Sequence, residues 1–314
     1  MAAGKNPLDP HVLFEHVQDA PYFHLPRFFA EEGADGHIYL PQPLATEIDG
    51  SDHGHGPSYE PKVEITTGVA VIDRSLKPMD FVLSKFMVIE ALVVIICVVL
   101  FGWLASQIKS GAAAKGKVAN LLETFCVFIR DEVARPAIGA KDADDYLPFL
   151  WTLFFFVLGC NLFGMIPWMG SPTGTLAVTG ILALMTFITV VGIGIAKYGV
   201  AGFLKVQVPH MDLPGPVAVL LVPMIFLIEL LGLLIKHGVL AVRLLANMMA
   251  GHIVLAVLIG FIGVASGWAW GAVMPASVLG ATALSLLELF VAFLQAYIFV
   301  FLSALFIGAV VHPH

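Results

Sequence analysis

Of the four charged side chains in the two longest apolar segments of the chain, three are candidates for chemistry, and the fourth is Lys236. Glu229 and Arg243 fall within residues 214–264, and Glu288 falls within residues 278–310. A charge at the centre of a lipid bilayer costs about 2.5–3.5 kcal/mol on insertion scales, so each is expected to line a cavity or face a partner. A guanidinium stays protonated even when buried. Arg243 can therefore attract a carboxylate and repel cations, but it cannot carry protons.

A structural explanation competes with this functional one. The charged residues could pair with each other and hold helices together, and Lys236 could extend to the membrane interface. Pairing is a better explanation for Glu229 than for Arg243. Arg243 shares its helix face with three small residues, at i+3, i+4 and i+7: Ala246, Asn247 and Ala250. Because a narrow face lets another helix approach closely, we expect Arg243 to face a partner.

The composition indicates that these residues lie in a membrane. Of the 314 residues, 59% are hydrophobic and only 12% are charged, against about 25% charged in soluble domains. Residues 1–80 hold five basic and thirteen acidic side chains, while residues 147–314 hold seven charged side chains in all. The sequence predicts an all-α integral membrane protein, with a loosely structured acidic tail over 1–80 and a membrane domain over 81–314. A nucleic-acid partner is not expected.

Apolar stretches predict the first membrane crossings. Residues 86–108 form a span that is long enough, at 1.5 Å per residue, to cross about 30 Å of hydrocarbon. Residues 118–135 carry apolar side chains at helical spacing, which is typical of an amphipathic helix on the membrane surface. Two further spans, 147–167 and 175–196, are joined by a tight turn near Trp168.

The last two apolar segments are longer than upright crossings require. Residues 214–264 would extend about 75 Å as one helix. Two interpretations are open for them: two crossings that meet at Lys236-His237-Gly238, or one strongly tilted helix. Residues 278–310 also exceed one upright crossing, and the preceding connection supplies Trp268 and Trp270 for the interface.

Basic residues predict the orientation in the membrane. Six Lys or Arg side chains lie in the short connection 109–146, which the positive-inside rule assigns to the cytoplasm. The acidic tail before the first span is then outside. Lys197 and Lys205 follow the third span on the cytoplasmic side, as the rule requires, and the C-terminus is also expected in the cytoplasm.

Other chemistries have little support in the sequence. The stretch 111–117 fits phosphate-loop spacing, but Val118 occupies the position of the Ser or Thr that would hold Mg²⁺, and no strand precedes the loop. The stretch Asp52-His53-Gly54-His55-Gly56 has metal-binding residue types, and we interpret it as a solvated loop. The three cysteines share no metal-ligand spacing. No cofactor or metal is expected.

Three motifs, in this order, resemble subunit a of the rotary F-type ATP synthase. They are Asn161-Leu162-Phe163-Gly164-Met165-Ile166-Pro167, then Arg243-Leu244-Leu245-Ala246-Asn247-Met248-Met249-Ala250-Gly251-His252, then Glu288 with Leu294-Gln295-Ala296-Tyr297-Ile298-Phe299. The resemblance covers roughly residues 80–310. It implies one span, a surface helix, a two-span hairpin and a long, strongly tilted helical hairpin against a rotating ring of c subunits. The resemblance therefore favours one tilted helix over two crossings in residues 214–264.

The resemblance also implies site residues. Six residues match positions involved in ion translocation: Arg243, Glu288, His252, Glu229, Gln295 and Asn247. Arg243 matches the essential arginine that faces the ring, and Gln295 matches the glutamine beside it on the partner helix. His252 and Glu288 match an imidazole and acid pair in the outer half-channel. Glu229 matches an acidic position in the inner half-channel.

Helix spacing supports this pairing independently of the resemblance. Arg243 and His252 are nine residues apart, or about 13.5 Å along a helix, and Gln295 and Glu288 are seven apart, or about 10.5 Å. In an antiparallel hairpin both pairs are expected to meet. Glu229 would then lie toward the cytoplasm, and one fixed cation would separate two sets of polar groups.

The implied function is that of a non-catalytic stator subunit that couples proton flow to rotation. The implied partners are the c-subunit ring, whose carboxylate would face Arg243, the b subunits of the peripheral stalk and the lipid bilayer. The implied location is the bacterial inner membrane, with the mitochondrial inner membrane as the alternative. Both H⁺ and Na⁺ stay open as the coupling ion, because the ring's own site mostly decides between them.

A proton-coupled solute transporter is the main alternative function. Intramembrane Arg, Glu and His would then bind an anionic substrate. That function predicts an internal repeat with broken helices in paired positions, and no repeat is visible in the sequence. A purely structural membrane anchor leaves the central Arg243 unexplained.

Overall fold

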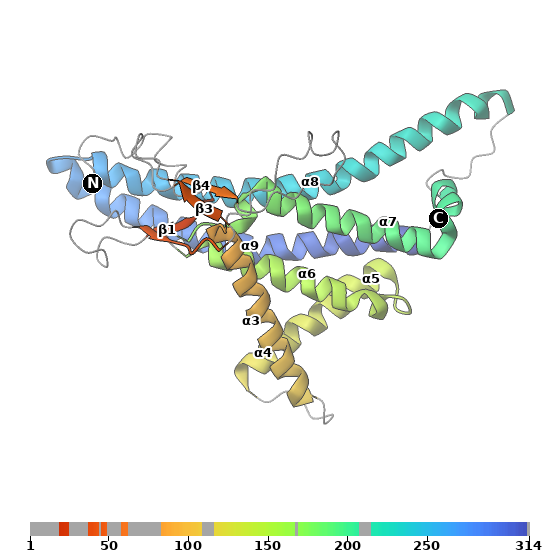
Figure 1. The fold of residues 1–314 in the computed structure, drawn as a ribbon, viewed down its shortest axis with the longest axis horizontal. Helices are drawn as coiled ribbons and strands as arrows, with labels where there is room; N and C mark the ends of the chain where they lie inside the picture. The colour runs from red at the N-terminus through yellow and green to blue at the C-terminus, as the bar shows by residue number, and fades with distance from the viewer. Residues whose placement is uncertain are drawn as a thin grey trace.

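The computed structural model describes residues 19–24, 37–43, 45–48, 58–61, 83–108, 116–166, 169–206 and 215–312, most of them helical (Figure 1). Five helices among these residues are long and apolar enough to cross a membrane: α3 (Lys85–Ile108), α6 (Ala143–Gly164), α7 (Leu176–Val206), α8 (Gly215–Val264) and α9 (Trp268–Val311). The predicted all-α membrane architecture is therefore confirmed.

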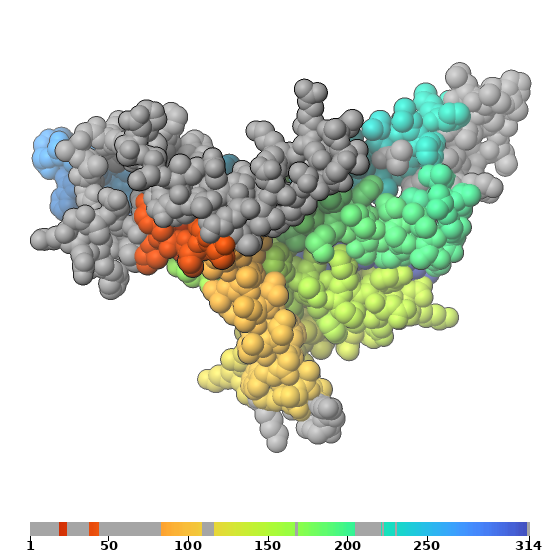
Figure 2. Space-filling model, viewed as in Figure 1, coloured from red at the N-terminus to blue at the C-terminus, as the bar shows by residue number. Residues whose placement is uncertain are grey.

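The helix α3 contacts the rest of the protein mainly through its N-terminal half. Phe86, Ile89 and Val93 are buried there in a small cluster with Cys160 of α6. In the C-terminal half, which is the inner half in the predicted orientation, Leu104 is the buried residue of this helix. This half diverges from the bundle, and Figure 2 shows α3 projecting from the body of the molecule.

The predicted surface helix is divided into α4 (Lys117–Phe128), the π-helix η1 (Ile129–Ala134) and α5 (Arg135–Ile138). Its polar side carries a charge cluster in which Asp131 Oδ1 lies 2.9 Å from Arg130 Nε and 2.7 Å from Arg135 Nη1. The hydrogen bond from Arg130 holds the pKa of Asp131 below its usual value. The opposite side packs on the bundle, since Ile129 and Val133 are buried.

The helices α6 and α7 form a hairpin whose turn includes η2 (Pro172–Gly174). Asn161 is fully buried at this turn: its Nδ2 donates to the carbonyl oxygen of Ala292 in α9, at 3.2 Å, and its Oδ1 accepts from Thr173, at 2.7 Å. The helix α7 continues to Val206, beyond the predicted end at 196, after a kink at Gly199, where φ is 70°. Asn161 thus ties the hairpin to α9.

The helices α8 and α9 are the long hairpin, and each is continuous. Residues 215–264 form one helix, which excludes the interpretation as two crossings. The helix α9 begins at Trp268, earlier than the predicted 278, because Gly267 turns the chain with φ of 62° and the two tryptophans lie in the first turn rather than in the connection. Leu240 and Leu244 of α8 and Ala296 and Phe299 of α9 lie in the main core.

The described parts of the acidic tail form two small antiparallel hairpins. Strand β1 (Tyr22–His24) pairs with β2 (His37–Tyr39), and β3 (Ala45–Ile48) pairs with β4 (Ser58–Pro61). The Gln42 side chain makes two 2.8 Å hydrogen bonds to the backbone of Leu83, just before α3. The His53 and His55 stretch lies outside the described residues.

Candidate functional site

The hairpin of α8 and α9 brings His252 and Glu288 together, as the spacing predicted. His252 Nδ1 lies 3.7 Å from Glu288 Oε1, and the two side chains are only 13% and 7% exposed. Neither His252 Nε2 nor Glu288 Oε1 has a hydrogen-bond partner among the described residues. The 3.7 Å separation is longer than a hydrogen bond, and a shift of less than about 1 Å would bring the two groups within the range of about 2.6–3.2 Å over which a proton is transferred.

The close approach of Glu288 depends on Gly251. A Cβ atom at this position would lie 2.7 Å from Glu288 Oε1 and 3.1 Å from its carboxyl carbon. Any larger residue would push the carboxyl group away from the α8 backbone. By contrast, a Cβ at Gly232, on the same helix, would meet open space.

Gln295 contacts Asn247 rather than Arg243. Asn247 Nδ2 donates to Gln295 Oε1 at 2.8 Å, and Gln295 is 2% exposed. The interval from His252 to Arg243 is two residues longer than that from Glu288 to Gln295, or about 3 Å along a helix. Once His252 and Glu288 are level, Gln295 lies midway between Arg243 and Asn247, and its hydrogen bond is with Asn247.

The side chain of Arg243 is half-buried and makes no hydrogen bond or ion pair with any other residue that the structure describes. Its neighbour Leu244 is fully buried in the core, so α8 is fixed at this point. The small residues that share its face, Ala246, Asn247 and Ala250, are all exposed. Among the described residues the guanidinium therefore has no counter-charge, and the narrow surface beside it is open.

Glu229 is separated from the other site residues and pairs with Lys236. Lys236 Nζ lies 3.6 Å from Glu229 Oε1, and the side chains are 53% and 45% exposed. The structural explanation for Glu229 therefore has direct support, although the pairing does not bury its carboxylate. Along α8 the polar groups follow the order Glu229, Arg243, His252, with about 21 Å and 13.5 Å between them.

His237 is a buried polar residue that was not identified as a site residue from the sequence. His237 is 3% exposed, and its Nδ1 lies 2.8 Å from the Leu233 carbonyl oxygen of the same helix. Its ring packs against Phe187 of α7 and Phe306 of α9, with centroids 5.3 and 4.5 Å away. The sequence signal that could have identified His237 is a histidine within an apolar segment. In the structure this residue lies where α7, α8 and α9 meet.

Known proteins resemble this chain over most of its membrane region. Residues 86–308 match the family described as ATP synthase A chain. The ATP synthase subunit a of Myxococcus xanthus is 47% identical over 218 residues, or 68% of this chain and 69% of that protein. The ATP synthase subunit a of Anaeromyxobacter sp. strain Fw109-5 is 36% identical over 306 residues, which cover 96% of this chain and 71% of that protein. The ATP synthase subunit a of Pelagibacter ubique is 38% identical over 234 residues, which cover 74% of this chain and 87% of that protein.

Proposed function

Because the chain belongs to the ATP synthase A chain family, we propose that Arg243 separates two offset half-channels through which protons reach and leave a ring of partner subunits. Family membership makes the chain a non-catalytic, multi-pass membrane subunit of ATP synthase that takes part in proton transport. The half-channels, the residue roles and the contact with the ring form the proposal.

The outer half-channel ends at His252 and Glu288. Support comes from their 3.7 Å contact and their near-complete burial. A proton from outside passes along this pair to a carboxylate on a ring subunit. The protonated acid can then turn into the lipid, because only the neutral form faces hydrocarbon without a large energetic cost.

The unpaired guanidinium of Arg243 is the observation that carries the proposal. After nearly a full turn of the ring, the acid loses its proton and becomes a carboxylate, which Arg243 attracts across the exposed face of Ala246 and Ala250. Since Arg243 is always charged, it also repels protons that would otherwise cross directly between the half-channels.

The inner half-channel lies on the side of Glu229. The half-exposed carboxylate supports a role as the release site, with Lys236 as its counter-charge. A membrane potential of 100 mV supplies about 2.3 kcal/mol per proton. Several protons must therefore pass for each ATP made elsewhere in the complex.

The proposed partners are a ring of c subunits, whose carboxylate faces Arg243, and the b subunits of the peripheral stalk. The proposed location is the bacterial plasma membrane, which the relatives from Myxococcus and Anaeromyxobacter favour. The proposed orientation has the N-terminal tail outside and the C-terminus in the cytoplasm, because the basic connection 109–146 favours the cytoplasmic side.

The Arg243→Ala variant tests the proposal. It should abolish ATP-driven proton pumping into inverted membrane vesicles and raise passive proton leak, while the complex still assembles. The control is Val242→Ala, which trims the exposed neighbouring side chain without removing a charge. Normal pumping by Arg243→Ala in an assembled complex would refute the role of Arg243.

Purification distinguishes the motor from the transporter. The proposal predicts that the chain copurifies with a ring of small two-span proteins, each with one membrane carboxylate. Saturable uptake of a solute by the isolated chain in vesicles would instead favour a transporter.

A further inference from the structure

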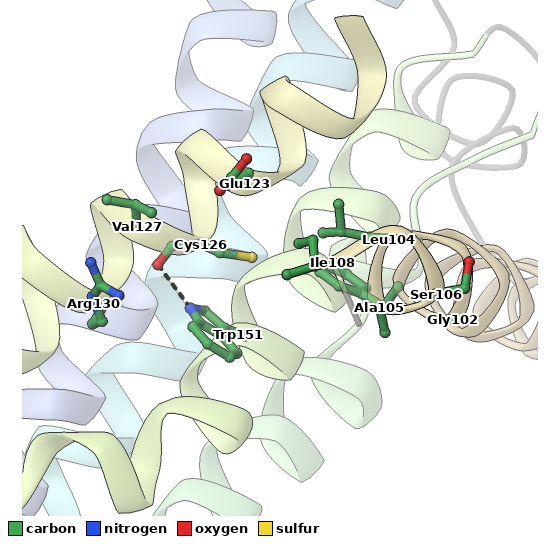
Figure 3. Close-up of a pocket in the computed structure, with 11 residues that line it drawn as sticks. Gly102, Leu104, Ala105, Ser106, Ile108, Glu123, Cys126, Val127, Arg130 and Trp151 are labelled. Atoms are coloured by element: carbon green, nitrogen blue, oxygen red, sulfur yellow. Dashed lines mark hydrogen bonds between the residues drawn. The ribbon is translucent and has the colours of Figure 1, made fainter. Parts of the chain in front are cut away.

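A cleft of about 1000 Å³ separates the inner half of α3 from the surface helix. Figure 3 shows Leu104 and Ile108 of α3 on one side and Val127 of α4 on the other, with Trp151 of α6 between them. The Trp151 indole donates its hydrogen to the Cys126 carbonyl oxygen at 3.0 Å. The indole N–H is therefore already satisfied, and this part of the lining is apolar.

A second cleft, of about 350 Å³, continues along the same wall between α3 and α6. Phe101 and Trp151 line both clefts, and the second one reaches as far as Val94. From Val94 to Ile108 the wall extends about 21 Å. This length matches half of a bilayer about 40–45 Å thick including the head groups. The two clefts together form a groove one leaflet deep.

The groove closes near the middle of the membrane. On the outer half of α3, Phe86, Ile89 and Val93 are buried against α6. The groove is thus shorter than the roughly 30 Å of hydrocarbon that a partner's membrane-spanning helix would cross. Its depth matches an acyl chain that enters from one leaflet.

Two opposite charges lie on the surface-helix side of the larger cleft. Glu123 and Arg130 both line it, two helical turns apart. Arg130 also donates to Asp131 from Nε at 2.9 Å and from Nη2 at 3.0 Å, which partly neutralises its charge. Asp131 is shared between Arg130 and Arg135, so the charged groups that line the cleft itself are one cation, Arg130, and one carboxylate, Glu123. A head group with one negative and one positive charge is complementary to Arg130 and Glu123.

We propose that this groove binds a phospholipid with an ethanolamine head group. Its acyl chain lies along the wall between α3 and α6, its phosphate contacts Arg130, and its primary ammonium contacts Glu123. The lipid enters from the cytoplasmic leaflet, which follows from the proposed orientation of the surface helix. The site fills the space beside α3 and does not depend on the proton path.

A groove-filling substitution tests the site in the assembled complex. Ala105 is exposed and lines the larger cleft, so Ala105→Trp should occupy the space. After washing in mild detergent, mass spectrometry should find about one retained phosphatidylethanolamine per copy of the wild-type chain and a loss of that lipid in the variant. Ala177→Trp is the control, since Ala177 is exposed on α7 and lines neither cleft.

Gly102→Trp is the second variant, because a Cβ at Gly102 meets open space and should not disturb folding. Equal subunit stoichiometry in all preparations confirms assembly. Retention of the same lipid in both cleft variants would overturn the proposal. So would a photo-reactive amino acid at position 105 that cross-links to a polypeptide instead of a lipid.

Head-group selectivity tests the roles of Glu123 and Arg130. The delipidated complex is offered equal amounts of phosphatidylethanolamine, phosphatidylglycerol and phosphatidylcholine, and the wild type should retain the ethanolamine lipid preferentially. Glu123→Gln should reduce its preference over phosphatidylglycerol by about two- to five-fold, the range of a partly exposed ion pair. A wild type that prefers phosphatidylglycerol, or a Glu123→Gln preference that is unchanged, would contradict the assignment.

Discussion

Gly251 holds a position where one methyl group would displace the carboxyl group of Glu288, which we propose transfers protons with His252. Gly251→Ala would place a carbon 2.7 Å from Glu288 Oε1, so the carboxyl group must move away from His252. Because the carboxyl group ends a flexible side chain, it can shift without unfolding the protein, and we expect ATP-driven proton pumping to fall about five-fold while the complex still assembles. The measurement is the initial pumping rate in inverted vesicles, normalised to the amount of complex.

Gly232→Ala is the matched control, because it adds the same methyl group to α8 in open space. Both substitutions favour the helix to the same extent. Their difference therefore reports the contact with Glu288. Equal pumping rates in the two variants would show that the position of Glu288 does not limit proton transfer.

The sequence predicted some contacts of single residues and not others. Spacing along two antiparallel helices was sufficient to predict that His252 meets Glu288. It did not predict the hydrogen bond between Asn247 and Gln295, because a shift of about 3 Å decides which residue is opposite. The buried place of His237 depends on aromatic rings from two other helices, and no local pattern contains that information.

At the scale of helices, the contact between α5 and α9 is the tightest backbone approach we find among the described glycines. A Cβ at Gly308 would overlap the carbonyl oxygen of Ala137, which is backbone and cannot rotate away. Gly308→Ala should therefore separate the end of the surface helix from α9 and destabilise the protein by about 1–3 kcal/mol. The level of the subunit in membranes, measured by immunoblot, should fall.

The control on the same helix is Gly271→Ala, since a Cβ at Gly271 meets no atom within 4 Å. It should leave the membrane level of the subunit unchanged. Gly308→Ala at the wild-type level would mean that the two segments are not packed this closely.

The existence of the helices was easier to predict than their continuity. Lys236-His237-Gly238 is typical of a turn, yet α8 continues through it because His237 bonds the Leu233 carbonyl of its own helix and its ring is buried. The π-helix η1 could not be predicted, because it depends on how Ile129 and Val133 reach the core. The predicted start of the last helix, residue 278, is later than the observed start at Trp268, because tryptophans typical of an interfacial connection lie in the first turn of α9.

At the scale of the whole molecule, the proposed orientation is open to direct labelling. In a variant without Cys97, Cys126 and Cys160, a cysteine is introduced either at Ser266, between α8 and α9, or at Lys141, before α6; both positions are exposed. A membrane-impermeant maleimide should label Ser266→Cys in intact spheroplasts. It should label Lys141→Cys only after the membrane is opened. The reverse pattern would invert the direction of both half-channels.

The most direct test of the account is the surroundings of Arg243 in a map of the assembled complex. The account predicts that a carboxylate of a ring subunit lies within about 4–6 Å of the guanidinium, the range over which opposite charges interact strongly. It also predicts that Ala246 and Ala250 face that subunit. A guanidinium paired within its own chain, or one facing lipid with no neighbouring ring, would contradict the account.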